Sequence, residues 1–194
     1  MVMKKLLLLN IIMILVIGVS GQEKYKAPDM PVFAIKTNAL YWATATPNLG
    51  VEFALSEKWT MDISGNYNPW KWSGNKKFKH WLVQPELRYW LCDRFSGHFF
   101  GVHAFYAQFN MCGIEAFGWK HKRYQGDLFG GGIAYGYHWI LGNRWSLEGT
   151  VGVGYAHIKY DKYKCEKCGP KLKDGRRNYV GPTKLGINLI YIIK

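Results

Sequence analysis

The stretch Trp81–Leu91, W-L-V-Q-P-E-L-R-Y-W-L, decides how the rest of the chain is interpreted. Gln84, Glu86 and Arg88 recur at every second position of an otherwise apolar segment. A helix would turn Glu86 away from its two polar neighbours and would contain Pro85 where a backbone N–H donor is needed. In a strand, side chains alternate between two faces. The stretch therefore predicts a strand with one charged face and one wholly apolar face.

Seven further segments alternate in the same way, so eight strands are predicted. They are Val32–Ala43, Thr46–Leu55, Trp59–Asn68, Trp81–Leu91, His98–Asn110, Gly126–Trp139, Arg144–His157 and Tyr179–Ile193. In each, one face is large and apolar, and Asp127, near the start of the sixth segment, is the one Lys, Arg, Asp or Glu on such a face; the other face is mostly small or polar. A soluble barrel or sandwich does the reverse. The pattern predicts an all-β fold, an eight-stranded antiparallel up-and-down transmembrane β-barrel with its large residues toward lipid.

The connections between these segments alternate in length. Residues 56–58, 92–97 and 141–143 are short, residues 70–80, 111–125 and 158–178 are long, and Thr44–Ala45 is a tight turn on the side of the long ones. Short periplasmic turns with longer outer loops are typical of outer-membrane barrels. Aromatic residues near the strand ends fit an interfacial girdle. Because a closed barrel has no edge strand to tolerate a missing N–H, we expect a β-bulge at Pro85.

The first 21 residues have the pattern of a secretory signal peptide. Lys4 and Lys5 precede a short apolar core, and small residues at 19–21 offer a cleavage site before Gln22. The alternative is an uncleaved membrane anchor, which the short core disfavours. The expected organisation is a signal peptide (1–21), a periplasmic tether (22–31) and an outer-membrane β-barrel (32–194). The predicted location is the cell outer membrane.

Ionisable residues also fall on the predicted inward faces of the strands. They are Lys36, Glu52, Asp62, Glu86, Arg88, His103, Glu148 and Lys184. An eight-stranded barrel is only just wide enough for its own side chains, and a buried unpaired charge costs several kcal/mol. The sequence therefore predicts an internal ion network that plugs the barrel. A gated pore lined by the same charges is the alternative.

The long loops are strongly basic in a chain of net charge +13. Clustered Lys and Arg suit phosphate groups, which predicts contact with lipopolysaccharide. A merely solvated charge run is one alternative. Nucleic-acid binding through the same charges and loop aromatics is another, but a surface barrel seldom meets nucleic acid. The candidate contacts are Lys71, Lys76, Lys77, Lys79, Lys120, Lys122, Arg123, Lys164, Lys167, Lys171, Lys173, Arg176 and Arg177.

The last long loop carries a C-x-x-C motif at Cys165 and Cys168. In an exported protein this spacing predicts a disulfide between the two. Half of a zinc site is the alternative, but zinc needs four ligands, and Cys112 or His121 would have to supply more. Cys92 lies in a periplasmic turn, a membrane's thickness from Cys112, so these two cannot pair. No metal or other cofactor is predicted.

An outer-membrane enzyme acting on lipid or peptide at the extracellular rim is the alternative function. It would use the loop residues His80, His121, His157 and Ser73. No Ser-His-Asp or paired-carboxylate spacing emerges among them. The sequence therefore favours a non-enzymatic barrel, in which alanine at the three histidines changes nothing.

Five segments also give the chain a family resemblance. They are I-K-T-N-A-L-Y-W-A-T (35–44), T-P-N-L-G-V-E-F-A-L (46–55), W-L-V-Q-P-E-L-R-Y-W-L-C (81–92), C-E-K-C-G (165–169) and G-P-T-K-L-G-I-N-L-I-Y (181–191). They resemble a domain-of-unknown-function family of small outer-membrane barrels from Bacteroidota. The resemblance implies a cell-envelope location, a loose association with adhesin or fimbria assembly, and no assigned activity. The expected function is thus an envelope scaffold or assembly accessory that contacts lipopolysaccharide. One departure from many such barrels is the terminal Lys194 in place of an aromatic residue.

Overall fold

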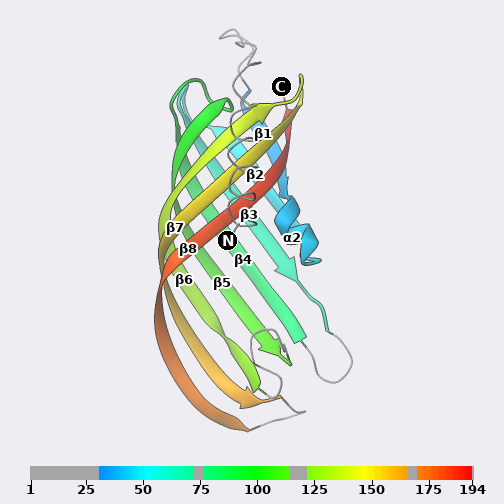
Figure 1. Ribbon diagram of the computed structural model, residues 1–194, viewed down its shortest axis with the longest axis vertical. Helices are drawn as coiled ribbons and strands as arrows, with labels where there is room; N and C mark the ends of the chain where they lie inside the picture. The colour runs from blue at the N-terminus through cyan, green and yellow to red at the C-terminus, as the bar shows by residue number, and fades with distance from the viewer. Residues whose placement is uncertain (1–30, 72–76, 114–121, 166–169, 194) are drawn as a thin grey trace, which may run out of the picture.

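Eight antiparallel strands follow one another around a single sheet (Figure 1). The computed structural model describes residues 31–71, 77–113, 122–165 and 170–193. Its elements are β1 (Phe33–Asn38), α2 (Ala39–Ala43), β2 (Asn48–Ala54), β3 (Trp59–Asn68), β4 (Lys77–Trp90), β5 (Gly97–Cys112), β6 (Lys122–Ile140), β7 (Trp145–Lys164) and β8 (Lys171–Ile193). The predicted all-β fold of eight up-and-down antiparallel strands is confirmed. The predicted signal peptide and most of the tether lie outside the described residues.

The sheet closes into a barrel because β1 pairs with both β2 and β8. β1 has four paired positions with β2 and six with β8. By contrast, β7 and β8 stay paired from Trp145↔Tyr191 to Tyr163↔Lys171. The barrel is therefore closed through its shortest strand.

The strands differ in length, so the barrel wall is short on the side of β1 to β3 and long on the side of β5 to β8 (Figure 1). β1 to β3 have 6 to 10 residues, whereas β5 to β8 have 16 to 23. We define the extension as residues 108–112 of β5, 122–128 of β6, 157–164 of β7 and 171–178 of β8. The prediction of long loops at residues 111–125 and 158–178 is wrong wherever these strands continue.

The first predicted strand is wrong beyond Asn38, where the chain enters the helix α2. The Asn38 side chain accepts a 3.0 Å hydrogen bond from the Leu40 N–H and caps the helix, a role that Asn commonly has. It also donates to the Leu185 carbonyl and accepts from the Ile187 N–H, both on β8. One side chain thus ends β1 and satisfies backbone groups that β1 no longer reaches. No helix among the described residues is long and apolar enough to cross a membrane.

Pro85 causes no β-bulge, so that prediction is also wrong. It stays paired with β3, and the β4–β5 register is the same on either side of it, at Val83↔Tyr106 and Glu86↔His103. The strand accommodates Pro by losing local pairing to β5, because Pro has no N–H to donate. Register shifts occur instead between β7 and β8, at residues 152/153 and 162/163 of β7.

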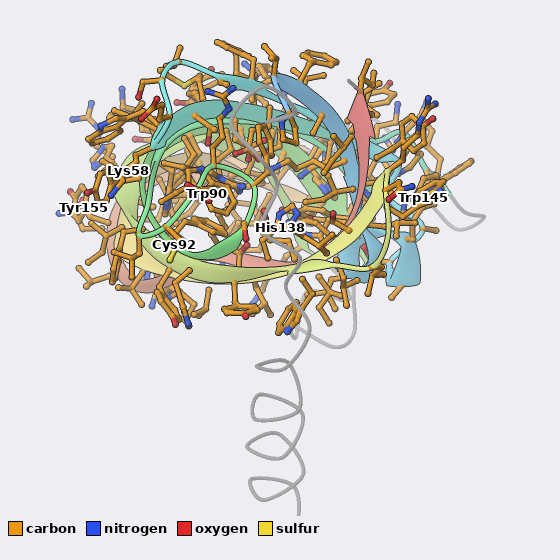
Figure 2. The ribbon with its side chains drawn as sticks, turned by 90° about the horizontal axis from the view of Figure 1, so that it is seen from above. Lys58, Trp90, Cys92, His138, Trp145 and Tyr155 are labelled. Carbon is orange, nitrogen blue, oxygen red and sulfur yellow. A yellow bond between two sulfur atoms is a disulfide. The ribbon has the colours of Figure 1, made fainter. Side chains whose placement is uncertain are left out.

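Side chains inside the barrel are mostly polar, and those outside are large and apolar (Figure 2). Of the buried side chains in the described part of the chain, 16 are polar or charged and 11 are hydrophobic. On the outside, Val102 and Leu185 are each 65% exposed. In Figure 2, Trp90 and His138 lie within the ring of strands, whereas Trp145 points away from it. The alternation in the sequence therefore corresponds to an inside-out distribution of polarity.

This distribution reverses in the extension. On β7, Val153 and Tyr155 are exposed on the outer face, but Lys159 takes that face further along the strand. Ile158 and Tyr160 then point to the inner, concave side, where they line one cavity. The extension therefore has the polarity of an ordinary water-exposed sheet. A pattern that changes faces within one strand, among many charges, resembles a loop in the sequence.

Candidate functional site

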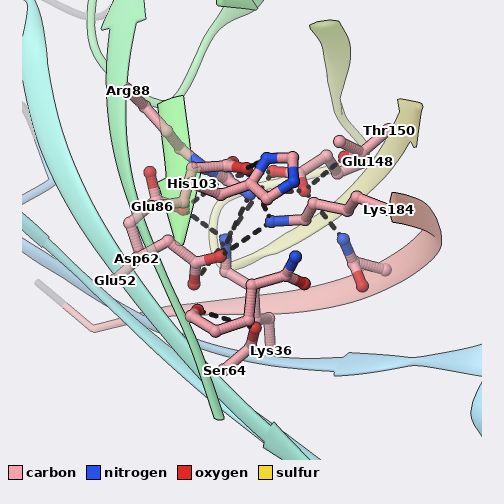
Figure 3. A network of polar contacts seen from close by, with 12 residues as sticks. Lys36, Glu52, Asp62, Ser64, Glu86, Arg88, His103, Glu148, Thr150 and Lys184 are labelled. Atoms are coloured by element: carbon pink, nitrogen blue, oxygen red, sulfur yellow. Dashed lines mark hydrogen bonds and ion pairs between the residues drawn. The ribbon is translucent and has the colours of Figure 1, made fainter. Parts of the chain in front are cut away.

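Arg88 is the centre of the polar interior (Figure 3). It enters from β4, is fully buried, and contacts carboxylates from β2, β3, β4 and β7. The nitrogen–oxygen distances are 2.8 Å to Glu52, 3.2 Å to Asp62, 2.7 Å to Glu86 and 2.7 Å to Glu148. A guanidinium carries five N–H donors in one rigid plane. A single side chain can therefore hold four acids together.

Two lysines bind carboxylates of the same cluster. Lys36 of β1 contacts Glu52 directly and lies 3.3 Å from Asp62. Lys184 of β8 lies 2.9 Å from Glu86 and 3.5 Å from Asp62. The first and last strands of the barrel are thus both tied to its centre by a cation.

Two histidines complete the cluster. His103 of β5 has its Nδ1 3.5 Å from Glu86, and His138 of β6 has its Nδ1 4.0 Å from Glu148. The structure brings together all eight residues predicted to face the interior. It adds His138, which the alternation of Gly126–Trp139 already places on the inward face. We call the set the interior network: Lys36, Glu52, Asp62, Glu86, Arg88, His103, His138, Glu148 and Lys184.

Neutral side chains hydrogen-bond the carboxylates that the cations reach. Glu148 accepts hydrogen bonds of 2.9 Å from the Thr150 hydroxyl and 2.7 Å from the Asn188 amide. Thr60 donates to Glu52 in the same way. Buried charges are stable only when they are both paired and hydrogen-bonded. These neutral residues supply the second condition, and the charge pattern alone does not single them out.

Glycines make room for the network, which then fills the interior. A Cβ added at Gly101 would lie 2.7 Å from Glu86 Cδ, and one at Gly50 would lie 2.7 Å from Lys36 Cγ. The cavity beside Lys36 has a volume of only about 30 Å³. That is room for a few water molecules at most. The described interior therefore favours a plug over a pore.

An apolar floor lies next to the network. Trp90 and Phe99 are fully buried, with ring centroids 4.8 Å apart, and the Arg88 guanidinium lies 4.4 Å from the Phe99 ring centroid. Phe95, in the turn between β4 and β5, has a positive φ of 60° and packs in a buried cluster with Ile190. A non-glycine residue rarely adopts such a φ. Burial of the Phe95 ring in this cluster, at the end of the barrel formed by the turn, offsets the backbone strain.

The predicted lipopolysaccharide contacts divide between the two faces of the long strands. By register and alternation, the outward ones are Lys77, Lys79, Arg123, Lys171 and Arg176. Those on the inward side are Lys122, Lys164, Lys173 and Arg177. Lys71 forms an isolated bridge with Lys77. Lys76, Lys120 and Lys167 lie outside the described residues.

Neighbouring polar groups hold two of the outward cations. Arg123 donates hydrogen bonds of 2.9 Å to Asn110 and 2.7 Å to Gln125. Lys171 lies 2.8 Å from Asp161, and its hydrogen bond lowers the pKa of the Asp161 carboxyl below the ordinary value. Asp161 thus compensates the charge of Lys171, whereas the hydrogen-bond partners of Arg123 are neutral amides.

The disulfide joins Cys112 to Cys165, so the predicted Cys165–Cys168 pairing is wrong. The two Cα atoms are 5.8 Å apart, within the usual range of roughly 4.4–6.8 Å. Cys112 ends β5 and Cys165 follows β7, and both strand ends pair with the first residues of β6. The fold therefore juxtaposes cysteines 53 residues apart, which local spacing cannot reveal. Cys168 lies outside the described residues, and Cys92 is free and exposed.

Of the histidines considered for catalysis, the two that the structure describes, His80 and His157, do not converge. His80 lies on the face of β4 that continues into Glu86, toward the interior. His157 lies on the outer face of β7, 2.8 Å from the Asn178 side-chain oxygen and beside the Phe129 ring. The other two candidates, Ser73 and His121, lie outside the described residues. Among those described, no group of three His, Cys, Asp or Glu side chains is arranged to hold a metal ion.

Comparison with known proteins gives one finding. A family model described as "Protein of unknown function (DUF3575)" matches residues 7–193. No curated protein and no solved structure matches the chain.

Proposed function

The chain belongs to the DUF3575 family of proteins of unknown function, and we propose that it is a non-enzymatic barrel of a Gram-negative outer membrane. In this proposal the signal peptide (1–21) directs export, and residues 22–31 form a periplasmic tether. The plugged barrel is an envelope scaffold, or an accessory to the assembly of surface adhesins or fimbriae. Its outward cations contact lipopolysaccharide.

The observation that carries the proposal is the belt of large apolar side chains around the barrel. Val102, Ile133 and Leu185 are more than 60% exposed, and Arg88 and Glu148 are fully buried behind them. Soluble monomers rarely expose a contiguous apolar surface larger than a few hundred Å². A lipid-facing wall around a polar interior is the arrangement of a transmembrane barrel.

The reversal of polarity in the extension supports a position for the outer membrane boundary. On the barrel side of this boundary the outward residues are large and apolar, as at Tyr155 and Phe129. In the extension, beyond the boundary, the outward residues are charged, as at Lys159 and Asp127. Aromatic residues are enriched where hydrocarbon meets water. We infer that the boundary crosses β6 between Asp127 and Phe129 and β7 between His157 and Lys159.

Two neighbouring cations lie immediately beyond this inferred boundary. Lys159 and Arg176 are register partners on the outer face of β7 and β8, and the Lys159 ammonium lies 5.9 Å from the Phe129 ring centroid. In the proposed orientation these two cations lie where the phosphate groups of lipopolysaccharide are expected. Arg forms paired hydrogen bonds with phosphate oxygens, and clustered cations raise the local concentration of anions.

The test compares two double variants that each remove two positive charges from β7 and β8. Lys159→Gln with Arg176→Gln neutralises an outward register pair, and Lys162→Gln with Lys173→Gln neutralises an inward one. Cations near an anionic surface contribute about 1 kcal/mol each, so the outward variant should weaken lipopolysaccharide binding roughly thirty-fold. The inward variant should bind like the wild type.

Binding is measured with protein in nonionic micelles titrated with purified lipopolysaccharide at rising NaCl concentration. Wild-type affinity should fall with salt, and the outward variant should depend on salt less steeply. Equal loss of affinity in both variants, or salt-independent binding, would contradict the contact with lipopolysaccharide.

Two further experiments test export and partners. The intact mass of protein from the outer-membrane fraction should correspond to a chain that begins at Gln22, and a retained Met1 would contradict cleavage. Cross-linking in native outer membranes, read by mass spectrometry, tests the adhesin or fimbria association.

A further inference from the structure

The concave side of the extension contains a cavity that the proposed function does not use. Its volume is about 360 Å³, within the range of roughly 300–1,000 Å³ that is usual for ligand sites. The apolar lining comes from three adjacent strands. It consists of Phe109, Met111, Tyr124, Leu128, Ile158 and Tyr160. We call this cavity the cup.

The register places the cup on the inner face of the barrel wall. Leu128 pairs with Ala107 and Ile158, and all three lie on the face that continues into the buried Ala156. Phe105, which is 7% exposed, lies between the cup and His103 of the interior network. A buried aromatic side chain therefore separates the cup from the interior network.

The cup is open on the side where the barrel wall is short. β1 pairs with β8 only at residues 188–193 of β8, so beyond this pairing the other edge of β8 has no strand partner among the described residues (Figure 1). The disulfide between Cys112 and Cys165 joins the end of β5 to the end of β7 across β6. A ligand could therefore enter from the side of β1 and α2, close to the inferred membrane boundary.

Arg177 gives the cup its chemical character, because it is the one charged residue in the lining. Its side chain is exposed, and within the described residues its guanidinium has no hydrogen-bond or ion-pair partner. An unpaired guanidinium at the edge of an apolar cavity complements a monovalent anion attached to an apolar chain.

We propose that the cup binds a single-chain fatty acid, with the chain against Leu128 and Ile158 and the carboxylate on Arg177. One cation matches one carboxylate, and the cavity lies near the lower end of the ligand-site range, which suits one chain rather than several. The source is a free fatty acid, not a phospholipid head group. This site is independent of lipopolysaccharide contact, which uses the outer face of the same strands.

The experiment uses full-length protein in nonionic micelles and dodecanoic acid that carries a photoreactive diazirine at its chain end. After irradiation, peptide mapping should find adducts on β6 and β7 around Leu128 and Ile158. Arg177→Gln should lower this labelling about tenfold or more, as expected for loss of a charge-assisted hydrogen bond. Its matched control is Arg176→Gln, the neighbouring residue on the outward face.

A second pair of variants tests the cavity itself. Leu128→Trp fills the cup and should abolish labelling there, whereas Phe129→Trp changes its outward neighbour and should not. Unlabelled dodecanoate should compete, and dodecanol and a lysophospholipid should not. Heat-modifiable gel migration confirms that each variant is folded.

Three outcomes would overturn the proposal. The first is labelling confined to outward residues such as Ile133. The second is an equal effect of Arg176→Gln and Arg177→Gln, which would indicate general attraction to a basic surface. The third is competition by the lysophospholipid as strong as that by dodecanoate, which would indicate a lipid head-group site.

Discussion

A single guanidinium organises the interior of this barrel. Arg88 contacts Glu52, Asp62, Glu86 and Glu148, and all five side chains are buried. Such a cluster tolerates the removal of a partner poorly, because each remaining carboxylate keeps its desolvation cost without its counter-charge. Leu87, the neighbour of Arg88 on the strand, lies on the outer, apolar face of the barrel.

Arg88→Ala should destabilise the folded barrel by about 3–5 kcal/mol, the range for breaking a buried pair. Leu87→Arg should cost about 2–4 kcal/mol for a different reason, because in the proposed membrane barrel it places a cation on the face toward lipid. Urea unfolding of protein folded in detergent or lipid measures both.

Lys58→Ala, at an exposed turn, is the control and should stay within about ±0.5 kcal/mol. A near-neutral Arg88→Ala is what a water-exposed strand face would give, and it would contradict the plugged interior.

At the scale of elements, alternation predicted the strands well where one face stays apolar throughout. The bounds of β3 are those predicted, Trp59–Asn68, and the inward parity of β4 leads directly to Arg88. The extension was not predictable by this rule, because its apolar residues change faces at the inferred membrane boundary. The helix α2 depends on the tertiary contacts of Asn38 with β8, which no local pattern contains. The cup joins Leu128 to Arg177 across three strands, so its residues become a set only in the folded sheet.

The disulfide between β5 and β7 allows an element-scale prediction. Nonreducing peptide mapping should recover Cys112 linked to Cys165. Changing both to Ser should destabilise the protein by up to about 4 kcal/mol, because the closed loop is long. Cys92→Ser, which removes the free exposed thiol, is the control and should change neither the map nor the stability. Recovery of a Cys165–Cys168 peptide in its place would contradict the pairing.

At the scale of the whole molecule, the interior is built in layers along the barrel. The floor of Trp90 and Phe99 closes one end, the interior network fills the middle, and Phe105 separates the network from the cup. Each layer alone obstructs the axis of a barrel this narrow. The layers predict that the charged residues of the interior do not form a conduction path.

Purified protein in a planar bilayer should therefore give no steady single-channel current. Trp90→Ala, which opens the floor, should also remain silent because the interior network still fills the barrel. Arg88→Ala should stay silent as well, although it removes the cation that holds four carboxylates together, because the floor of Trp90 and Phe99 still closes one end. Steady conductance from the wild type would contradict the layered closure.

The unequal lengths of the strands have a consequence for how the barrel comes apart. β1 is held by ten backbone pairings in all, four with β2 and six with β8, so amide hydrogens along this seam should exchange with solvent deuterium sooner than those at the centre of β6. A buried ion pair adds to these pairings, because Lys36 reaches across to Glu52 and Asp62. The interior network thus links β1 to its neighbours from inside the barrel. Lys36→Met should accelerate amide exchange in β1 while amide exchange in β6 stays slow. The seam at β1, which has few pairings and is fastened in part by one buried cation, is therefore the expected starting point for unfolding of the barrel.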